Sequence, residues 1–230
     1  MLQANKLCMR YDDTLAIKDL SFTVAPGEIF CLLGQNGAGK TTTINIFLGL
    51  ITPTSGEALI DNHSTKDNKF AKNRIAYIPE IVQLYGNLSG LENLDFFSRL
   101  AGFIYSKEEL NDFLLRANLQ EDAHQKKLDT YSKGMRQKVG IAIALAKNAS
   151  YILMDEPTSG LDPKASVEFA EICKELSANG VGILMATHDI FNAVNIGSKI
   201  GIMREGTLVH TTETAKISAQ ELQDLYIKTI

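Results

Sequence analysis

Residues 34–41 of this 230-residue chain read Gly34-Gln35-Asn36-Gly37-Ala38-Gly39-Lys40-Thr41. This stretch has the pattern G-x-x-x-x-G-K-T, which is typical of phosphate-binding loops. The apolar run 29–33 before it predicts a buried strand, and residues 42–50 after it have the apolar spacing of a helix. Strand, glycine-rich loop and helix form the context that this motif requires, so the stretch predicts a site for a nucleoside triphosphate.

The residue types of the loop suit an anion. Glycines allow positive φ and close backbone approach, so that successive N–H groups can surround phosphate oxygens. The start of the following helix adds a partial positive charge. We expect Lys40 to reach the β- and γ-phosphates and the Thr41 hydroxyl to bind Mg²⁺. The predicted phosphate-binding residues are Gly34, Gln35, Asn36, Gly37, Ala38, Gly39, Lys40, Thr41 and Thr42.

The composition is that of an ordinary globular protein, with 45% hydrophobic residues and a net charge of −4. No long lysine or arginine run is present in the sequence, so no nucleic-acid partner is expected. The three cysteines form no metal-binding or paired spacing, which favours free thiols in a reducing compartment. Neither a secretory leader nor a membrane-spanning apolar run is found, so we expect a chain that at most docks on a membrane.

The hydrophobic pattern divides the chain into two kinds of structure. Strand patterns at 1–10, 16–24, 57–60 and 75–78 surround the loop. Two capping boxes of the form S-x-x-E, beginning at Ser89 and Ser106, then predict helices, the second running to about Leu119. Further expected elements are a helix at 163–178, a strand at 181–186, a hairpin from 199–203 to 207–210, and a short helix after Ser218.

A second polar cluster follows the apolar strand 151–154. Asp155 and Glu156 end this strand, and a carboxylate in such a place can hold Mg²⁺ while its neighbour activates water. His188 follows the next strand, where a parallel sheet could bring it beside the γ-phosphate. The alternative interpretation is a pair of solvated acids and a structural histidine, and the phosphate loop favours the functional one.

Taken together, the motifs resemble those of the ABC-type ATPases over residues 2–228. Tyr11 resembles the aromatic residue that stacks on adenine, the segment 131–137 resembles the family signature, 155–163 resembles the magnesium strand with its catalytic glutamate, and His188 resembles the switch histidine. The resemblance implies that Ser132 and Gly134 contact the γ-phosphate of an ATP bound by another subunit. Two ATP molecules would then lie in a head-to-tail homodimer, or in a heterodimer with a related ATPase.

Two positions depart from the family pattern. The signature is usually L-S-G-G-Q, whereas this chain has Tyr131-Ser132-Lys133-Gly134-Met135, so Lys133 adds positive charge at the expected anion site. Glu80 stands where the family usually has Gln, near Mg²⁺. Glu80 can still approach Mg²⁺, but it cannot donate a hydrogen bond when ionised.

The resemblance implies an α/β fold: a phosphate-loop NTPase core with a parallel-containing sheet, an N-terminal antiparallel β subdomain and an inserted α-helical subdomain. We expect one domain over 1–230, with 1–80 and 148–230 as core and 81–147 as helical insertion. The implied function is an ATP-hydrolysing subunit, with ATP and Mg²⁺, that drives transport through a separate polytopic permease, with export favoured. It would lie in the cytoplasm on the inner face of the cell membrane. The alternative is a non-transport ABC-type ATPase, such as a factor for iron–sulfur cluster assembly.

Overall fold

The computed structural model describes residues 1–229, apart from the side chain of residue 68. Its central element is a six-stranded sheet with the strand order β10-β9-β3-β8-β7-β6. Neighbouring strands from β9 to β6 run parallel, and β10 pairs antiparallel with β9. The strands are β3 (Ile29–Leu33), β6 (Ile75–Ile78), β7 (Tyr151–Asp155), β8 (Gly182–Thr187), β9 (Lys199–Arg204) and β10 (Thr207–Glu213).

Strand β3 is apolar throughout because both faces of this sheet are covered. Its alternate side chains enter two different cores. Phe30 and Leu32 belong to one core, and Ile29, Cys31 and Leu33 belong to the other. Burial raises the pKa of the Cys31 thiol to about 12, so Cys31 packs as an inert apolar group.

A four-stranded antiparallel sheet covers one side of the core and has the order β2-β1-β4-β5. Helix α1 (Lys40–Phe47) packs against strands of both sheets. The aromatic rings of Phe22, Phe30 and Phe47 join the layers, with Phe22 stacked 5.1 Å from Phe30. The strands are β1 (Leu2–Tyr11), β2 (Thr14–Val24), β4 (Ser55–Ile60) and β5 (His63–Ser64).

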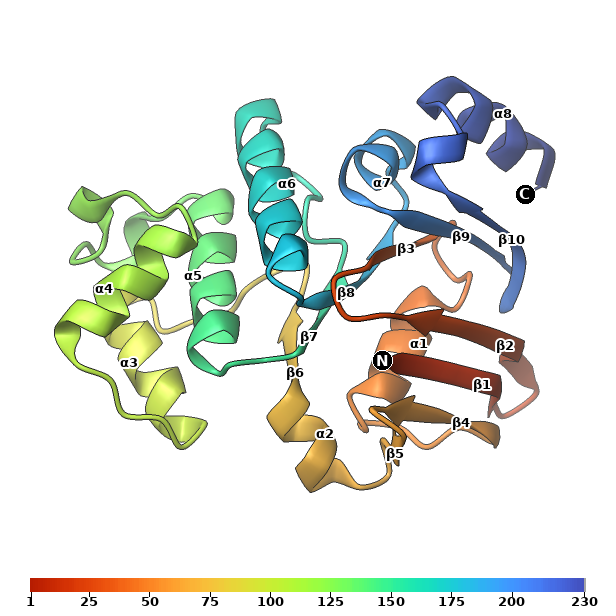
Figure 1. Ribbon diagram of the computed structural model, residues 1–230, viewed down its shortest axis with the longest axis horizontal. Coiled ribbons are helices and arrows are strands. Elements are labelled where there is room, and N and C mark those ends of the chain that lie inside the picture. Colours follow the sequence, from red (N-terminus) through yellow and green to blue (C-terminus); the bar gives the residue numbers. More distant parts are fainter. Residues whose placement is uncertain (230) are drawn as a thin grey trace.

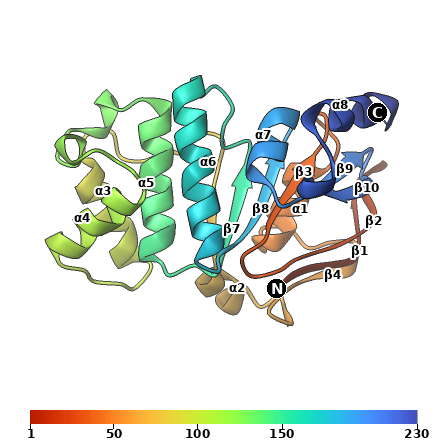
Figure 2. The same ribbon diagram turned by 45° about the horizontal axis from the view of Figure 1, so that its top comes forward.

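The other face of the six-stranded sheet is covered by α5 (Lys133–Ala146), α6 (Pro163–Ala178) and α7 (Ile190–Ile196), which stand side by side in Figure 2. Helices α3 (Gly90–Leu100) and α4 (Lys107–Arg116) pack against α5 and lie at the opposite end of the molecule from the four-stranded sheet (Figure 1). The predicted capping boxes at Ser89 and Ser106 are both present.

The remaining elements are α8 (Ala219–Thr229) and three short 3₁₀ helices at Glu121–Ala123, Leu128–Thr130 and Thr214–Lys216. Within residues 1–229, no helix has both the length and the apolar character needed to cross a membrane.

Several boundaries differ from those expected from the sequence. Helix α4 ends at Arg116 rather than near Leu119, because Asn118 adopts a left-handed conformation with φ 56°. Helices α2 (Asn68–Arg74) and α7 were not predicted. Each is only seven residues long, too short for a clear helical period, and each starts at an aspartate cap, Asp67 or Asp189. The predicted hairpin of β9 and β10 is confirmed.

Candidate nucleotide site

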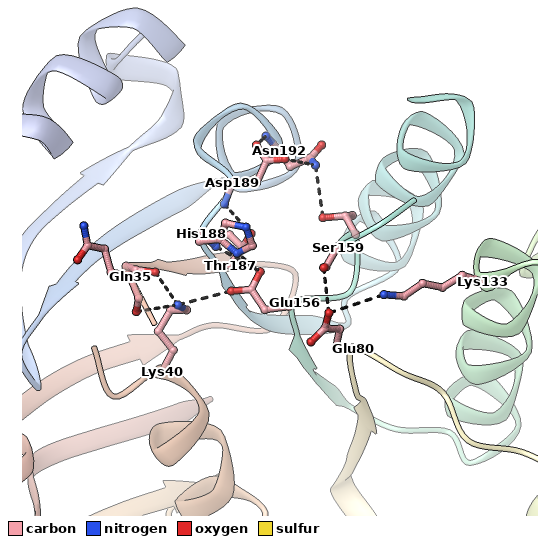
Figure 3. Close-up of polar contacts among 12 residues, drawn as sticks. Gln35, Lys40, Glu80, Lys133, Glu156, Ser159, Thr187, His188, Asp189 and Asn192 are labelled. Carbon is pink, nitrogen blue, oxygen red and sulfur yellow. Dashed lines mark hydrogen bonds and ion pairs between the residues drawn. The ribbon is translucent and has the colours of Figure 1, made fainter. Parts of the chain in front are cut away.

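The predicted phosphate loop and the predicted carboxylates meet at one edge of the six-stranded sheet. The loop follows β3, Asp155 ends β7, and His188 follows β8, the strand between them. Parallel neighbours place their carboxyl ends together, which is where ligands bind in open α/β sheets. A cleft of about 480 Å³ lies there, lined by Tyr11, Ala16, Gln35, Asn36, Gly37, Ala38, Gly39, Lys40, Thr41, Thr42, Glu80, Asp155 and Glu156. Figure 3 shows Gln35, Lys40, Glu80 and Glu156 among these residues.

The loop conformation requires glycine at two positions. Gly39 has φ +101°, and a Cβ built there would lie 2.7 Å from the Ala16 carbonyl oxygen. A Cβ on Gly34 would lie 2.6 Å from the Met203 carbonyl oxygen. Both distances are shorter than real contacts, so a side chain at either position would displace the loop from β2 or β9.

Lys40 is buried at the base of the cleft and is 5% exposed. Its ammonium donates hydrogen bonds to the carbonyl oxygens of Gly34 and Gln35, and it lies 3.5 Å from Oε1 of Glu156. A buried ammonium needs such partners. Phosphate oxygens could replace them, which is how a lysine in this position would engage a nucleotide.

Asp155 and Glu156 each have a buried carboxylate oxygen that lacks a hydrogen-bond donor within residues 1–229. Among the described residues, neither Oδ1 of Asp155 nor Oε1 of Glu156 receives a hydrogen bond, although both atoms are buried. Burial raises the pKa of Asp155; the nearby Thr41 hydroxyl and Lys40 oppose this rise, while Glu156 and Glu80 add to it. A divalent cation would remove this cost, because it favours the ionised carboxylates.

These residues fit Mg²⁺, which typically takes few protein ligands and completes its shell with water and phosphate oxygens. Thr41 and Asp155 supply a hydroxyl and a carboxylate in one cleft. Within residues 1–229, no cluster of three or more His, Cys, Asp or Glu side chains suits a metal ion. A site here would therefore depend on the nucleotide for further oxygen ligands.

His188 and Glu156 are directly connected. Nδ1 of His188 lies 2.8 Å from Oε2 of Glu156, and the His188 backbone N–H donates to the same oxygen. Glu156 has φ 46°, an uncommon backbone conformation of the kind that concentrates at functional sites. One oxygen of Glu156 is thus held, and the other faces the cleft region beside Lys40.

Tyr11 lines the cleft at the end of β1 and is 44% exposed, so its ring face is accessible. Ser132 and Gly134 lie elsewhere: they line a separate cleft at the start of α5, together with Asp162 and Lys164. Ser132 caps this helix by accepting a hydrogen bond from the Met135 N–H. The structure therefore does not bring Ser132 and Gly134 together with Lys40 in one chain.

The surroundings of Glu80 were not predicted from the sequence. Its Oε1 accepts a hydrogen bond from the Ser159 hydroxyl at 2.9 Å and lies 3.8 Å from Nζ of Lys133. Gln137, also unpredicted, donates to the backbone carbonyls of Pro79 and Glu80. One indication of this contact was present in the sequence: Lys133 and Glu80 both depart from the family pattern, and they carry opposite charges.

The parallel sheet, the glycine loop at its edge, the buried lysine and the paired carboxylates define a phosphate-loop nucleoside triphosphatase. A family model described as "ABC transporter" matches residues 17–159. The ABC transporter ATP-binding protein YxlF of Bacillus subtilis, itself uncharacterized, is 33% identical over 228 residues, covering 98% of this chain and 75% of that protein. The linearmycin resistance ATP-binding protein LnrL of Bacillus subtilis is 32% identical, covering 91% of this chain and 68% of that protein.

Among solved structures, the chain is similar to the dimeric ATP-binding cassette MJ0796 in a post-hydrolysis state bound to ADP and Pi. The TM-score is 0.82 at 28% identity, covering 93% of this chain and 99% of that one. The chain belongs to the family of ABC transporter ATP-binding subunits. It is an ATPase that binds and hydrolyses ATP, and the predicted α/β fold of this family is confirmed.

Proposed function

We propose that two such subunits, identical or related, bind two Mg²⁺–ATP head to tail and thereby drive export through a separate polytopic membrane protein. The observation that carries this proposal is the separation of two half-sites within one chain. Lys40 lies in one cleft, and Ser132 and Gly134 line another. A second chain is needed to bring a helix start of this kind to the γ-phosphate.

In the proposed site, Tyr11 stacks on the adenine ring and the loop from Gly34 to Thr42 surrounds the phosphates. The ring of Tyr11 is half-exposed beside the loop, as a stacking residue must be. Lys40 exchanges its carbonyl partners for phosphate oxygens. Because the loop is held against β2 and β9 by glycine contacts, its N–H groups need little reorganisation when ATP arrives.

We assign the Mg²⁺ contacts to Thr41 and Asp155, with Glu80 near the ion. When bound, Mg²⁺ would neutralise phosphate charge and polarise the γ-phosphoryl group. The buried, unpaired Oδ1 of Asp155 supports this assignment, since an orphaned carboxylate oxygen is costly without a partner. The Thr41 hydroxyl lies beside the same carboxylate.

Glu156 is the proposed general base. Its Oε2 is held by His188. Its Oε1 lies 3.5 Å from Nζ of Lys40 but receives no hydrogen bond from the described residues, so it can accept the proton of the attacking water. His188 positions this carboxylate, and its side chain, 58% exposed beside Glu156, is accessible to a γ-phosphate. The nearby Lys40 ammonium offsets the negative charge of Glu156.

We further propose that residues 81–147 form a helical unit that transmits closure to the membrane subunit. Apolar side chains of this unit remain exposed: Ile81, Tyr85 and Phe96 are 64%, 49% and 41% exposed. Tyr85 packs edge-on against Phe96 at 5.1 Å, which makes a preformed aromatic surface. Exposed apolar patches of this kind mark protein interfaces.

Export is supported by the resistance function in the name of LnrL. The proposed location is the inner face of the cell membrane, with the chain peripheral in the cytoplasm. The test is co-purification from detergent-solubilised membranes of the native host. A stoichiometric polytopic protein is expected; a soluble partner, or full ATPase activity with no membrane partner, would instead favour an assembly factor and contradict transport.

A further inference from the structure

A single carboxylate connects three segments of the site. Oε1 of Glu80, just after β6, accepts a hydrogen bond from Ser159 and pairs with Lys133 (Figure 3). Ser159 follows Glu156 by three positions, and Lys133 is the first residue of α5. Glu80 therefore links the edge of the ATP cleft to the start of the helix that carries Ser132 and Gly134.

Glu80 also lines the same cleft as Asp155 and Glu156. Lys40 lies beside Glu156, and Lys133 lies beside Glu80. Lys133 thus offsets a negative charge that would otherwise be free to approach a cation in the cleft.

The Glu80 side chain can change partners while its backbone stays in place. Gln137 donates from one amide nitrogen to the carbonyls of Pro79 and Glu80, both at 3.2 Å. The side chains of Lys133 and Glu80 are 32% and 51% exposed, and an ion pair at such exposure is weak. A fixed backbone and a weak side-chain pair are the properties needed for exchange.

We propose that Lys133 is a positioning residue for nucleotide binding: with Ser159 it holds the Glu80 carboxylate, and Glu80 leaves both for the Mg²⁺ shell when ATP binds. This inference rests on the proposed Mg²⁺ site at Thr41 and Asp155. Its consequence is that filling the chain's own ATP site frees Lys133 at the start of α5. ATP binding in one chain would thereby change the charge environment at the start of α5, the helix proposed to contact the ATP of the other chain.

The test is binding of the non-hydrolysable analogue AMP-PNP, measured by calorimetry over a series of Mg²⁺ concentrations. Lys133→Met removes the competitor and should lower the Mg²⁺ concentration for half-maximal binding about two- to fivefold, the range for one weak ion pair. Glu80→Gln should raise that concentration. When Glu80→Gln is already present, adding Lys133→Met should not change the Mg²⁺ concentration further, because Lys133 is proposed to act only through the Glu80 carboxylate.

Two more variants make the test specific. Ser159→Ala keeps both charges and should shift the midpoint in the same direction as Lys133→Met, but less. Lys126→Met removes a comparable surface ion pair with Asp122 and should leave the midpoint unchanged. If Lys133→Met weakens AMP-PNP binding, or has the same effect with Glu80 and with Gln at position 80, the inference about Lys133 is wrong, but the proposed Mg²⁺ site is unaffected. Wild-type binding that is independent of Mg²⁺ would overturn the proposed Mg²⁺ site as well.

Discussion

The substitution Glu156→Gln separates ATP binding from ATP hydrolysis most sharply. It preserves the size of a side chain that is only 16% exposed, but it removes the basic oxygen that faces Lys40. A positioned general base contributes about 10²- to 10⁴-fold in rate, so kcat should fall by roughly that factor, or about 3–5 kcal/mol. ATP affinity should be unchanged or higher, since Lys40 loses a competing carboxylate 3.5 Å away.

Phosphate release at saturating ATP gives kcat, and calorimetric titration gives the affinity. Glu213→Gln is the matched control, because it makes the same change at an exposed residue that pairs with Lys216 away from the nucleotide cleft. The reasoning is refuted if Glu156→Gln turns over within threefold of wild type, or if its rate falls only because ATP no longer binds.

Four further outcomes follow from the structure. Lys40→Ala should weaken ATP binding strongly in a titration, and an unchanged affinity would remove Lys40 from the phosphate site. Gly39→Ala should lower the free energy of unfolding by roughly 1–3 kcal/mol in urea, because φ +101° and the 2.7 Å approach to a carbonyl disfavour a Cβ; wild-type stability would contradict this. Tyr151→Phe removes a hydrogen bond to the Asp61 carboxylate at 2.7 Å and should lower the free energy of unfolding in urea by about 1.5–3 kcal/mol. Equal urea midpoints for the variant and the wild type would contradict this. Burial opposes ionisation of Asp61, but hydrogen bonds from the amino terminus, Tyr151 and Arg74 lower its pKa from 3.8 to about 2. The ionised Asp61 therefore stabilises the folded state fully above about pH 4, and this contribution is lost as the pH falls towards 2. Asp61→Asn should flatten the dependence of the free energy of unfolding on pH in this range.

Features encoded by contiguous residues could be predicted from the sequence. The loop from Gly34 to Thr41 carries its flanking strand, its glycines and its lysine in one segment, so its geometry follows from local chemistry. The sequence predicted that Asp155 and His188 lie at one edge of the sheet, because one ends and the other follows a buried parallel strand; the two strands, β7 and β8, are neighbours in the sheet.

Contacts between distant segments could not be predicted in the same way. Ser159 and Glu80 are 79 positions apart, and their hydrogen bond depends on how α5, β6 and the segment after β7 pack together. Lys133 was expected to add charge for a partner's phosphate, whereas in the structure it pairs with Glu80 of its own chain. Asp61 likewise gathers Tyr151 and Arg74, a cluster without a local motif.

In the proposed dimer, ATP joins two subunits because Ser132 and Gly134 of one chain complete the Lys40 cleft of the other. The most direct measurement is the solution mass of the purified Glu156→Gln variant by light scattering, with Mg²⁺ and with or without ATP. We expect the mass of one chain without ATP and of two chains with it, and Ser132→Glu should abolish the shift. A mass that stays at one chain while ATP is demonstrably bound would rule out the proposed dimer.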